Sequence, residues 1–178
     1  MTRATSSAPA RTSNRTARPR EDAVTRIEAG RRLPVSVRDG FDYITDPRNW
    51  LAYWPRVITV DPDTRWQRPG DRARIVLRLA GRRAALDMQL VRIDPYRRVE
   101  YTSEQAGLPA ARHRRHFEDR DGELAYRIVV EYDPRTGWRG LVDRSIVRRA
   151  TERAVRETLA NLDEQFRRDG RASAPRRV

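Results

Sequence analysis

The stretch FDYITDPRNWLAYWP, residues 41–55, places Phe41, Tyr43, Trp50 and Trp54 within a short segment that also contains two prolines. A continuous amphipathic helix would spread its apolar residues along one stripe and would not contain an internal proline. The pattern therefore predicts a helix, a break, and a second short helix that carries the tryptophans.

Capping signals around the stretch support this division. Ser36, followed three positions later by Asp39, is typical of a capped helix start. The residue before a proline avoids helical backbone angles, so Asp46 is expected to end the first helix. Asp46 also suits the N-cap of the second helix, and Pro47 its first position. Gly40 lies inside the first helix and is expected to weaken it by up to about 1 kcal/mol relative to alanine.

Six segments after this stretch carry strand signals: the first is short and ends in the turn DPD, and the other five alternate apolar and polar residues with the period of two that is typical of β-strands. An earlier segment, residues 23–34, alternates less regularly and is also expected to form a strand. Asp94-Pro95 and Asp121-Gly122 indicate turns between segments. Strands at this spacing without helices between them predict an antiparallel meander. The six segments are 57–60, 71–81, 84–94, 97–103, 109–119 and 123–132.

A long amphipathic helix is predicted near the end of the chain, at roughly residues 138–168. Its apolar residues recur at steps of three and four from Leu141 to Phe166, on an otherwise charged helix. Such a helix needs an apolar surface to cover. The inward face of a curved antiparallel sheet of about seven strands provides that surface, so the predicted fold class is α+β.

This order of elements, together with several motifs, resembles the Bet v 1/START-like helix-grip superfamily, also called SRPBCC. The motifs are Phe41-Asp42-Tyr43-Ile44, Asp46-Pro47-Arg48-Asn49-Trp50, Trp54-Pro55, and the strand–turn–strand at residues 91–99. The likeness covers about residues 22–168 and points to the bacterial polyketide cyclase/dehydrase and lipid-transport group. It implies a sheet that grips the long C-terminal helix around a cavity. It implies function only coarsely, because the superfamily contains both enzymes and carriers.

The net charge of +13 is concentrated at the two ends of the chain. Residues 1–20 hold five arginines, and residues 171–178 hold three, without any acidic residue. Removing these eight leaves 30 arginines against 25 acidic residues, a net charge of +5. We expect disordered basic tails at 1–21 and 170–178 around one domain, 22–169. Such tails can contact anionic lipid or nucleic acid weakly, and the arginine- and serine-rich start also resembles an organellar transit peptide.

The sequence argues against several kinds of site. It has no cysteine, which excludes disulfides and thiolate metal sites. It has no apolar run that could span a membrane and no secretory signal at its start, so a cytoplasmic location is expected. His113 and His116 point to opposite faces of a strand and cannot bind one metal ion together. Without a glycine-rich phosphate loop or a nucleophile motif, we expect no metal and no cofactor.

The inward faces of the predicted strands, together with the second short helix, suggest which residues line the cavity. Tyr132, Ser103 and Arg115 add polar groups to this lining. His113 and Tyr126 are the candidates for proton transfer, although both also suit ordinary structural positions. The residues expected to contact a ligand are Trp54, Leu77, Met88, Tyr101, His113, Phe117, Tyr126 and Ile128.

Three functions agree with these patterns. The first, which we favour, is a carrier or sensor that binds a lipid, isoprenoid or aromatic polyketide-like molecule in an internal cavity. The second is a polyketide cyclase, aromatase or dehydratase, which requires His113 or a tyrosine to face a cavity open to solvent. The third is an interaction protein whose arginine-rich surface and tails bind anionic partners, which requires the arginines to form one patch.

Overall fold

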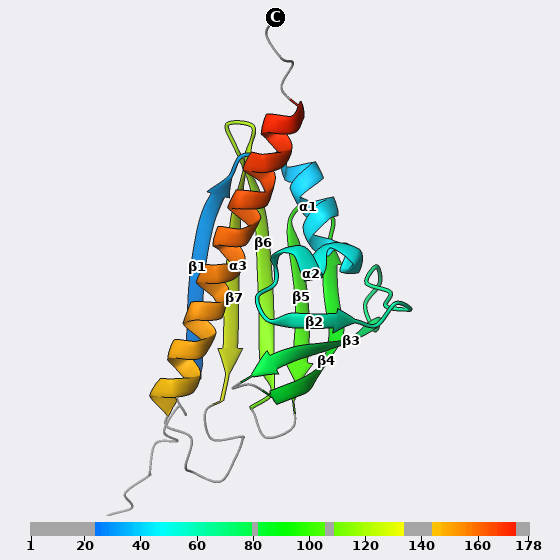
Figure 1. Ribbon diagram of the computed structural model, residues 1–178, viewed down its shortest axis with the longest axis vertical. Helices are drawn as coiled ribbons and strands as arrows, with labels where there is room; N and C mark the ends of the chain where they lie inside the picture. Colours follow the sequence, from blue (N-terminus) through cyan, green and yellow to red (C-terminus); the bar gives the residue numbers. More distant parts are fainter. Residues whose placement is uncertain (1–23, 80–81, 106–108, 134–143, 174–178) are drawn as a thin grey trace, which may run out of the picture.

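The computed structural model describes residues 24–79, 82–105, 109–133 and 144–173 of the chain. These residues form one antiparallel sheet with helices on its concave side (Figure 1). The strands are β1 (Thr25–Leu33), β2 (Val57–Val60), β3 (Arg72–Leu79), β4 (Arg82–Asp94), β5 (Arg98–Glu104), β6 (Ala111–Arg120) and β7 (Glu123–Tyr132). The helices are α1 (Val37–Thr45), the 3-10 turn η1 (Pro47–Asn49), α2 (Trp50–Tyr53) and α3 (Arg144–Ser173).

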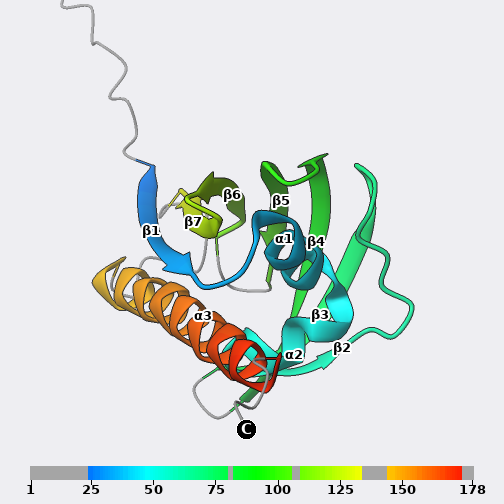
Figure 2. The same ribbon diagram turned by 90° about the horizontal axis from the view of Figure 1, so that it is seen from above.

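The sheet is the predicted meander, closed at one side by the first strand. Its order is β1-β7-β6-β5-β4-β3-β2, with every neighbouring pair antiparallel. The first strand lies beside the last, with Thr25 opposite Tyr132. Seen from above, the sheet curls around its concave side and α3 lies across the opening (Figure 2). This arrangement confirms the α+β helix-grip fold.

The helix–break–helix prediction is also confirmed. The Ser36 hydroxyl oxygen accepts a hydrogen bond from the backbone N–H of Asp39 at 3.1 Å and donates to the Asp39 carboxylate at 2.7 Å. The Asp46 carboxylate accepts from the backbone N–H of Arg48 at 2.9 Å. These two caps satisfy N–H groups that lack partners inside each helix, and they fix where the chain bends.

Gly40 has a packing role that the sequence pattern did not reveal. A Cβ atom at this position would lie 2.5 Å from Cδ2 of Leu124 and 3.1 Å from Cγ1 of Val35. Leu124 is fully buried on β7, so its side chain has little room to move away. The absence of a side chain at Gly40 therefore allows α1 to approach the sheet closely.

The helix α3 places one apolar stripe against the sheet. Its buried apolar residues are Val155, Leu159, Leu162 and Phe166. The helix continues to Ser173, beyond the expected end at residue 168 and into the expected tail 170–178. Residues 138–143 of the expected helix and the whole tail 1–21 lie outside the described residues. Among the described helices, none is long and apolar enough to cross a membrane.

The outer face of β1, β7 and β6 carries a network of ion pairs. Arg26 contacts Glu28 at 2.6 Å and Glu131 at 2.7 Å, and Arg127 contacts Glu28 at 2.8 Å. Arg114 forms a further ion pair with Glu131. Further arginines on the strands pair with nearby carboxylates in the ion pairs Arg74–Asp87, Arg98–Glu100 and Arg120–Glu118.

Candidate functional site

The interior between the sheet and the helices has two parts of different character. We call one the aromatic end, which lies under α1 and α2 and is lined by Ile44, Thr45, Trp50, Trp54, Trp66, Met88, Val99, Tyr101 and Arg115. We call the other the open end, which lies beside the first turns of α3 and is lined by Leu86, Ser103, Gln105, Pro109, Ala111, His113, Val130, Tyr132, Val147 and Thr151. Tyr101 lines one end and His113 the other, and their rings stack at 4.4 Å.

The aromatic end is filled by rings in edge-to-face contact. Trp50 lies 5.6 Å from Trp54 and 5.4 Å from Trp66, and Trp66 lies 5.6 Å from Tyr101, all measured between ring centroids. Such contacts add about 0.5–1.5 kcal/mol each beyond the burial of area. The space left among them is about 10 Å³, which is room for about one water molecule.

Hydrogen bonds fix the short helix α2 at this end. The Trp50 indole N–H and the Tyr53 hydroxyl both donate to the carbonyl oxygen of Ile44, at 3.2 Å and 2.8 Å. Complete burial raises the pKa of the Tyr53 phenol far above its ordinary value, so this hydroxyl stays protonated. Asn161 on α3 donates its side-chain amide to the Tyr53 carbonyl at 3.1 Å. Helices α1, α2 and α3 are thereby joined over the aromatic end.

Arg115 places a positive charge inside this aromatic surrounding. Arg115 is 6% exposed, and its guanidinium lies 5.1 Å from the centroid of the Trp54 ring and 5.2 Å from that of the Tyr101 ring. Its Nε and Nη2 donate to the Tyr101 hydroxyl oxygen at 3.2 Å and 2.7 Å, and its Nη1 donates to the Tyr126 hydroxyl oxygen at 2.7 Å. Burial raises the pKa of Tyr126 to about 12, so the phenol is neutral at physiological pH.

His113 lies two residues away on β6, at the open end. Its Nε2 is 2.8 Å from the Ser103 hydroxyl, with the donor set by the tautomer. Burial, together with the nearby Arg115 charge, lowers the pKa of His113 to about 3. The imidazole is therefore neutral at physiological pH and can give or accept one hydrogen bond at each nitrogen. Its partner in the HxxH pair, His116, faces the other side of the sheet, as predicted from the strand period.

The open end contains a hollow of about 140 Å³. An apolar cavity of about 150 Å³ holds a molecule the size of benzene. The polar groups of Ser103 and His113 lie at one side of the hollow, among apolar side chains such as Leu86 and Val130. This mixture of an apolar wall and a few fixed polar groups is typical of sites for small hydrophobic molecules.

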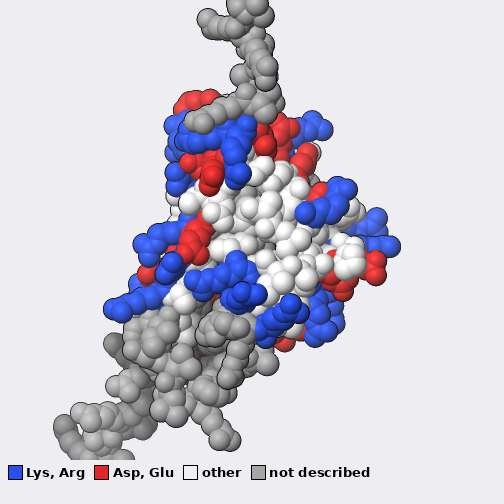
Figure 3. Space-filling model, viewed as in Figure 1, with Lys and Arg blue, Asp and Glu red and all other residues white. Residues whose placement is uncertain are grey.

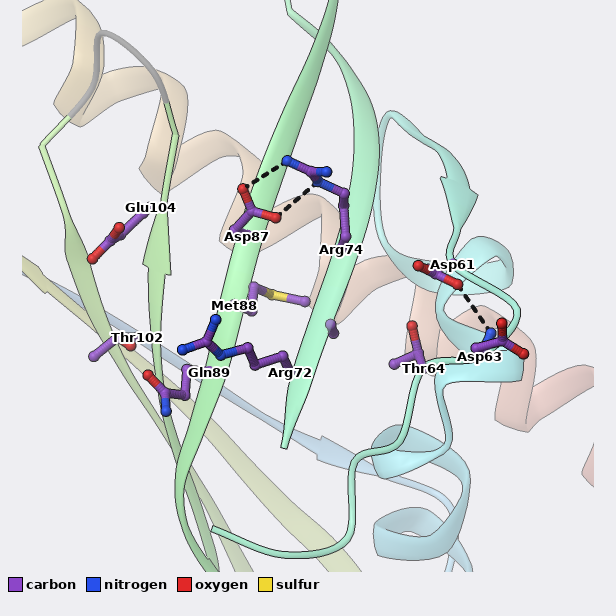
Figure 4. Close-up of a pocket in the computed structure, with 11 residues that line it drawn as sticks. Asp61, Asp63, Thr64, Arg72, Arg74, Asp87, Met88, Gln89, Thr102 and Glu104 are labelled. Atoms are coloured by element: carbon purple, nitrogen blue, oxygen red, sulfur yellow. Dashed lines mark hydrogen bonds and ion pairs between the residues drawn. The ribbon is translucent and has the colours of Figure 1, made fainter. Parts of the chain in front are cut away.

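Two further hollows lie on the outside of the molecule and are lined by charged residues. One, of about 350 Å³, crosses the outer face of β3, β4 and β5; Figure 4 shows its Arg74–Asp87 ion pair, with Asp61 and Asp63 across β3. The other, of about 630 Å³, runs between α1, α2 and the segment that follows β2. Their polar lining suits an apolar ligand poorly. Within the described part of the chain, no three His, Asp or Glu side chains group as metal ligands would.

The structure places the residues predicted to contact a ligand in several parts of the interior. Trp54, Met88 and Tyr101 line the aromatic end, and His113 lines the open end. Phe117 and Tyr126 are buried against each other, with ring centroids 5.0 Å apart. Ile128 belongs to the buried core, and Leu77 is partly buried against that core. Of the two tryptophans on the second short helix, Trp50 belongs to the buried core, and Trp54 is partly exposed and packs against Arg115.

Sequence reasoning missed the two aromatic residues Tyr53 and Trp66. Tyr53 is 1% exposed and Trp66 is 5% exposed. Trp66 is the one large apolar residue in the polar stretch DTRWQRPGD, residues 63–71, which was a usable signal for an anchor into the core. Arg115 was recognised as an inward polar group, but its phenol partners depend on strand register, which the pattern did not specify.

A curved sheet that grips a long helix around a small, mostly apolar interior defines a START-like helix-grip protein. The chain belongs to the polyketide cyclase/dehydrase and lipid-transport family, whose model matches residues 24–167. This membership supports binding of a hydrophobic small molecule or a cyclase reaction, without specifying either. No curated protein sequence matches the chain.

Solved structures with the same fold are distant in sequence. The Zhui aromatase/cyclase from Streptomyces sp. R1128 is similar with a TM-score of 0.72 and 14% identity, covering 88% of this chain and 100% of that one. TTHA0849 from Thermus thermophilus is similar with a TM-score of 0.69 and 16% identity, covering 84% and 100%. A START superfamily protein from Mycobacterium smegmatis is similar with a TM-score of 0.67 and 8% identity, covering 80% and 97%. At such identities the likeness concerns the fold alone.

Proposed function

We propose that the protein binds a hydrophobic small molecule between the sheet and α3, as a carrier or sensor without turnover. The observation that carries this proposal is the hollow of about 140 Å³ at the open end, with its apolar wall and the paired polar groups of Ser103 and His113. Well-packed interiors leave few spaces larger than one water molecule. A hollow of this size beside a long helix is therefore a feature that a ligand group would fill.

The electrostatics of the interior favour binding over proton-transfer catalysis. A general acid or base works best when its pKa lies near the operating pH. The pKa of His113 is lowered to about 3 and that of Tyr126 is raised to about 12, each chiefly by burial. Both groups are therefore fixed in their neutral forms across the physiological range. They can orient a ligand by hydrogen bonding, whereas the cyclase or dehydratase alternative needs one of them to change protonation readily.

The distribution of charge gives less support to the surface-binding alternative. On the face that carries α3, basic and acidic side chains are interspersed around an uncharged area (Figure 3). On the outer face of the sheet, arginines such as Arg26, Arg114 and Arg127 are paired with glutamates. An anion-binding surface would instead gather unpaired arginines in one patch.

Two measurements test the proposal. Native mass spectrometry of the purified protein, followed by denaturing extraction, should release a hydrophobic compound from the chain. Titration with the neutral dye Nile red should then show one saturable site that the extracted compound competes for. The absence of both a released compound and saturable dye binding would contradict binding in the interior.

Matched variants locate the site. Ala111→Phe adds a ring to a residue that lines the hollow and should weaken Nile red binding by about tenfold or more. Ala85→Phe makes the same change on the exposed outer face of β4 and should leave the affinity unchanged. Equal dye affinities for the two variants would place the ligand elsewhere.

A further inference from the structure

We infer that Arg115 binds a carboxylate group of the ligand, so that the ligands of this protein are hydrophobic carboxylic acids. This inference rests on the proposed function, because it specifies the polar contact within the same interior. It is carried by the charge of Arg115, by the surplus of hydrogen-bond donors around it, and by its position relative to the open end.

The first argument is the missing countercharge. Arg115 is 6% exposed and stays protonated at physiological pH. Within the described part of the chain, its hydrogen bonds go to two phenols and to no carboxylate. Asp163, which is equally buried at 6% exposed, is by contrast paired with Arg31 at 2.7 Å and with Arg167 at 3.0 Å. Burying an unpaired charge is unfavourable by several kcal/mol, and a ligand carboxylate would supply the countercharge.

The second argument is a surplus of donors. A guanidinium has five N–H groups. The three hydrogen bonds that Arg115 donates to described residues share two acceptors, the hydroxyl oxygens of Tyr101 and Tyr126. Each phenol that accepts from Arg115 still has its own O–H to donate, and among the described residues neither finds an acceptor. The Tyr53 hydroxyl already donates to the Ile44 carbonyl. A cluster rich in donors and poor in acceptors is complementary to an oxyanion.

The third argument is geometry. Arg115 and His113 project from the same face of β6, two residues apart, which corresponds to about 7 Å along a strand. The Tyr101 hydroxyl contacts the guanidinium, and the His113 ring stacked on Tyr101 lines the hollow at the open end. A ligand with its apolar body in that hollow could therefore reach Arg115 with a carboxylate after a shift of these rings.

The same geometry gives the binding event a spectroscopic signature. The space beside Arg115 is about 10 Å³, too small for a carboxylate, which needs more room than one water molecule. Trp54 covers the guanidinium face and is partly exposed, and Trp66 borders both this space and the outer groove near α1. A carboxylate that reaches Arg115 must enlarge this space, and Trp54 and Trp66 are part of its lining, so acid binding should change tryptophan fluorescence.

The test compares acids with their isosteric neutral amides on the full chain. The probes are 2-naphthoic acid with 2-naphthamide, and decanoic acid with decanamide, titrated by calorimetry and by tryptophan fluorescence at pH 7. We expect each acid to bind about tenfold more tightly than its amide or better, the ratio that one charge-assisted contact provides. Arg115→Gln should reduce this ratio to about one while it preserves amide binding. Arg112→Gln, an exposed arginine on the outer face of the same strand, should keep the ratio of the unmodified chain.

Two additional variants keep the test decisive if Arg115→Gln does not fold. Arg115→Lys retains the charge and should retain part of the acid preference, whereas Tyr126→Phe removes one donor and should reduce it. Equal affinities of acid and amide in the unmodified chain would overturn the carboxylate site and leave the proposed function intact. An acid preference that survives in Arg115→Gln, or that is undiminished in both Arg115→Lys and Tyr126→Phe, would also overturn it. Binding of none of the four probes would overturn the carboxylate site, and the additional absence of a released compound and of saturable Nile red binding would overturn the proposed function.

Discussion

The aromatic end and the open end are built from the same two strands, yet one is filled and the other is not. Tyr101 and Ser103 follow each other at a spacing of two on β5, as Arg115 and His113 do on β6. Under α1 and α2 the remaining space is about 10 Å³, and beside α3 it is about 140 Å³. One step of the strand period therefore separates a region that stabilises the fold from a region available to a ligand.

The largest effect should come from removing a ring at the aromatic end. Trp50→Ala deletes a buried indole that contacts two other tryptophans and donates to Ile44, and it should lower the free energy of unfolding by about 3–5 kcal/mol. Val147→Ala at the open end removes two methyl groups from a partly exposed side chain that lines the hollow. It should lower the free energy of unfolding by less than about 1 kcal/mol. Urea denaturation of both variants measures the difference. Similar losses would mean that the two ends contribute equally to stability.

A second prediction concerns how closely α1 sits over the aromatic end. Gly40→Ala should lower the free energy of unfolding by about 1–3 kcal/mol, because the new methyl group meets Leu124 and Val35. Helix propensity alone would predict the opposite, because alanine favours a helix more than glycine does. Gly170→Ala in α3 has open space around it and should be neutral or stabilising by up to about 1 kcal/mol. Thermal unfolding of the pair is the measurement, and stabilisation by both substitutions would contradict the packing role of Gly40.

A third prediction uses pH to examine the open end. The unfolded chain protonates His113 below about pH 6.5, whereas the folded chain does so only near its lowered pKa of about 3. The stability contributed by the neutral imidazole is therefore complete above pH 6.5 and decreases as the pH falls towards 3. His113 should change the free energy of unfolding by at most about 1 kcal/mol per pH unit, since its side chain is partly exposed to the hollow.

The variant His113→Asn isolates this contribution. Unfolding free energies measured between pH 7 and pH 5 should decrease less for His113→Asn than for the unmodified chain, because carboxylates titrate mainly at lower pH. Partial burial and the charge of Arg127 also lower the pKa of His116 on the outer face. His116→Asn should therefore reduce the pH dependence of the free energy of unfolding too, but by a smaller amount. Parallel pH profiles for the unmodified chain and His113→Asn would show that the imidazole is not held neutral.

The smallest effect on stability should come from the buried charge itself. Arg115→Met replaces an unpaired guanidinium with an apolar side chain of similar length, and the gain in desolvation should offset the lost contacts with phenols and with Trp54. The free energy of unfolding should change by less than about 1 kcal/mol. Denaturant titration checks this, and a loss comparable to that of Trp50→Ala would show that Arg115 stabilises the fold rather than serving a ligand.

Most of the fold could be predicted from local patterns, because those patterns have local physical causes. Pro47 keeps the residue before it out of helical backbone angles and so ends α1, and Asp46 and Ser36 cap helices through contacts within a few residues. Alternation along each strand assigned the inward side chains correctly, including His113 and Arg115. These features do not depend on which strand lies beside which.

The candidate site depended on pairing between distant strands, and for that reason its central feature was not predicted. Outward Arg114 lies opposite Glu100 and near Glu131, whereas inward Arg115 lies opposite Val99 and Ile128. The sequence RHRR contains both arginines without any sign that only one is paired with an acid. Trp66 likewise belongs to no periodic segment, and its burial follows from the path of the connection between β2 and β3.

The pairing of β1 with β7 has a consequence for how the chain folds during synthesis. Thr25 of β1 pairs with Tyr132, so the first strand leaves the ribosome long before its partner exists. At about 5–20 residues per second, the ribosome needs roughly 5 to 20 s to make the residues between them. During that interval β1 must stay soluble and unpaired, and its charged residues Arg26, Glu28, Arg31 and Arg32 disfavour pairing with other chains. Closing the sheet is thus a late, long-range step, which slows folding relative to the hairpins that form β3 to β7.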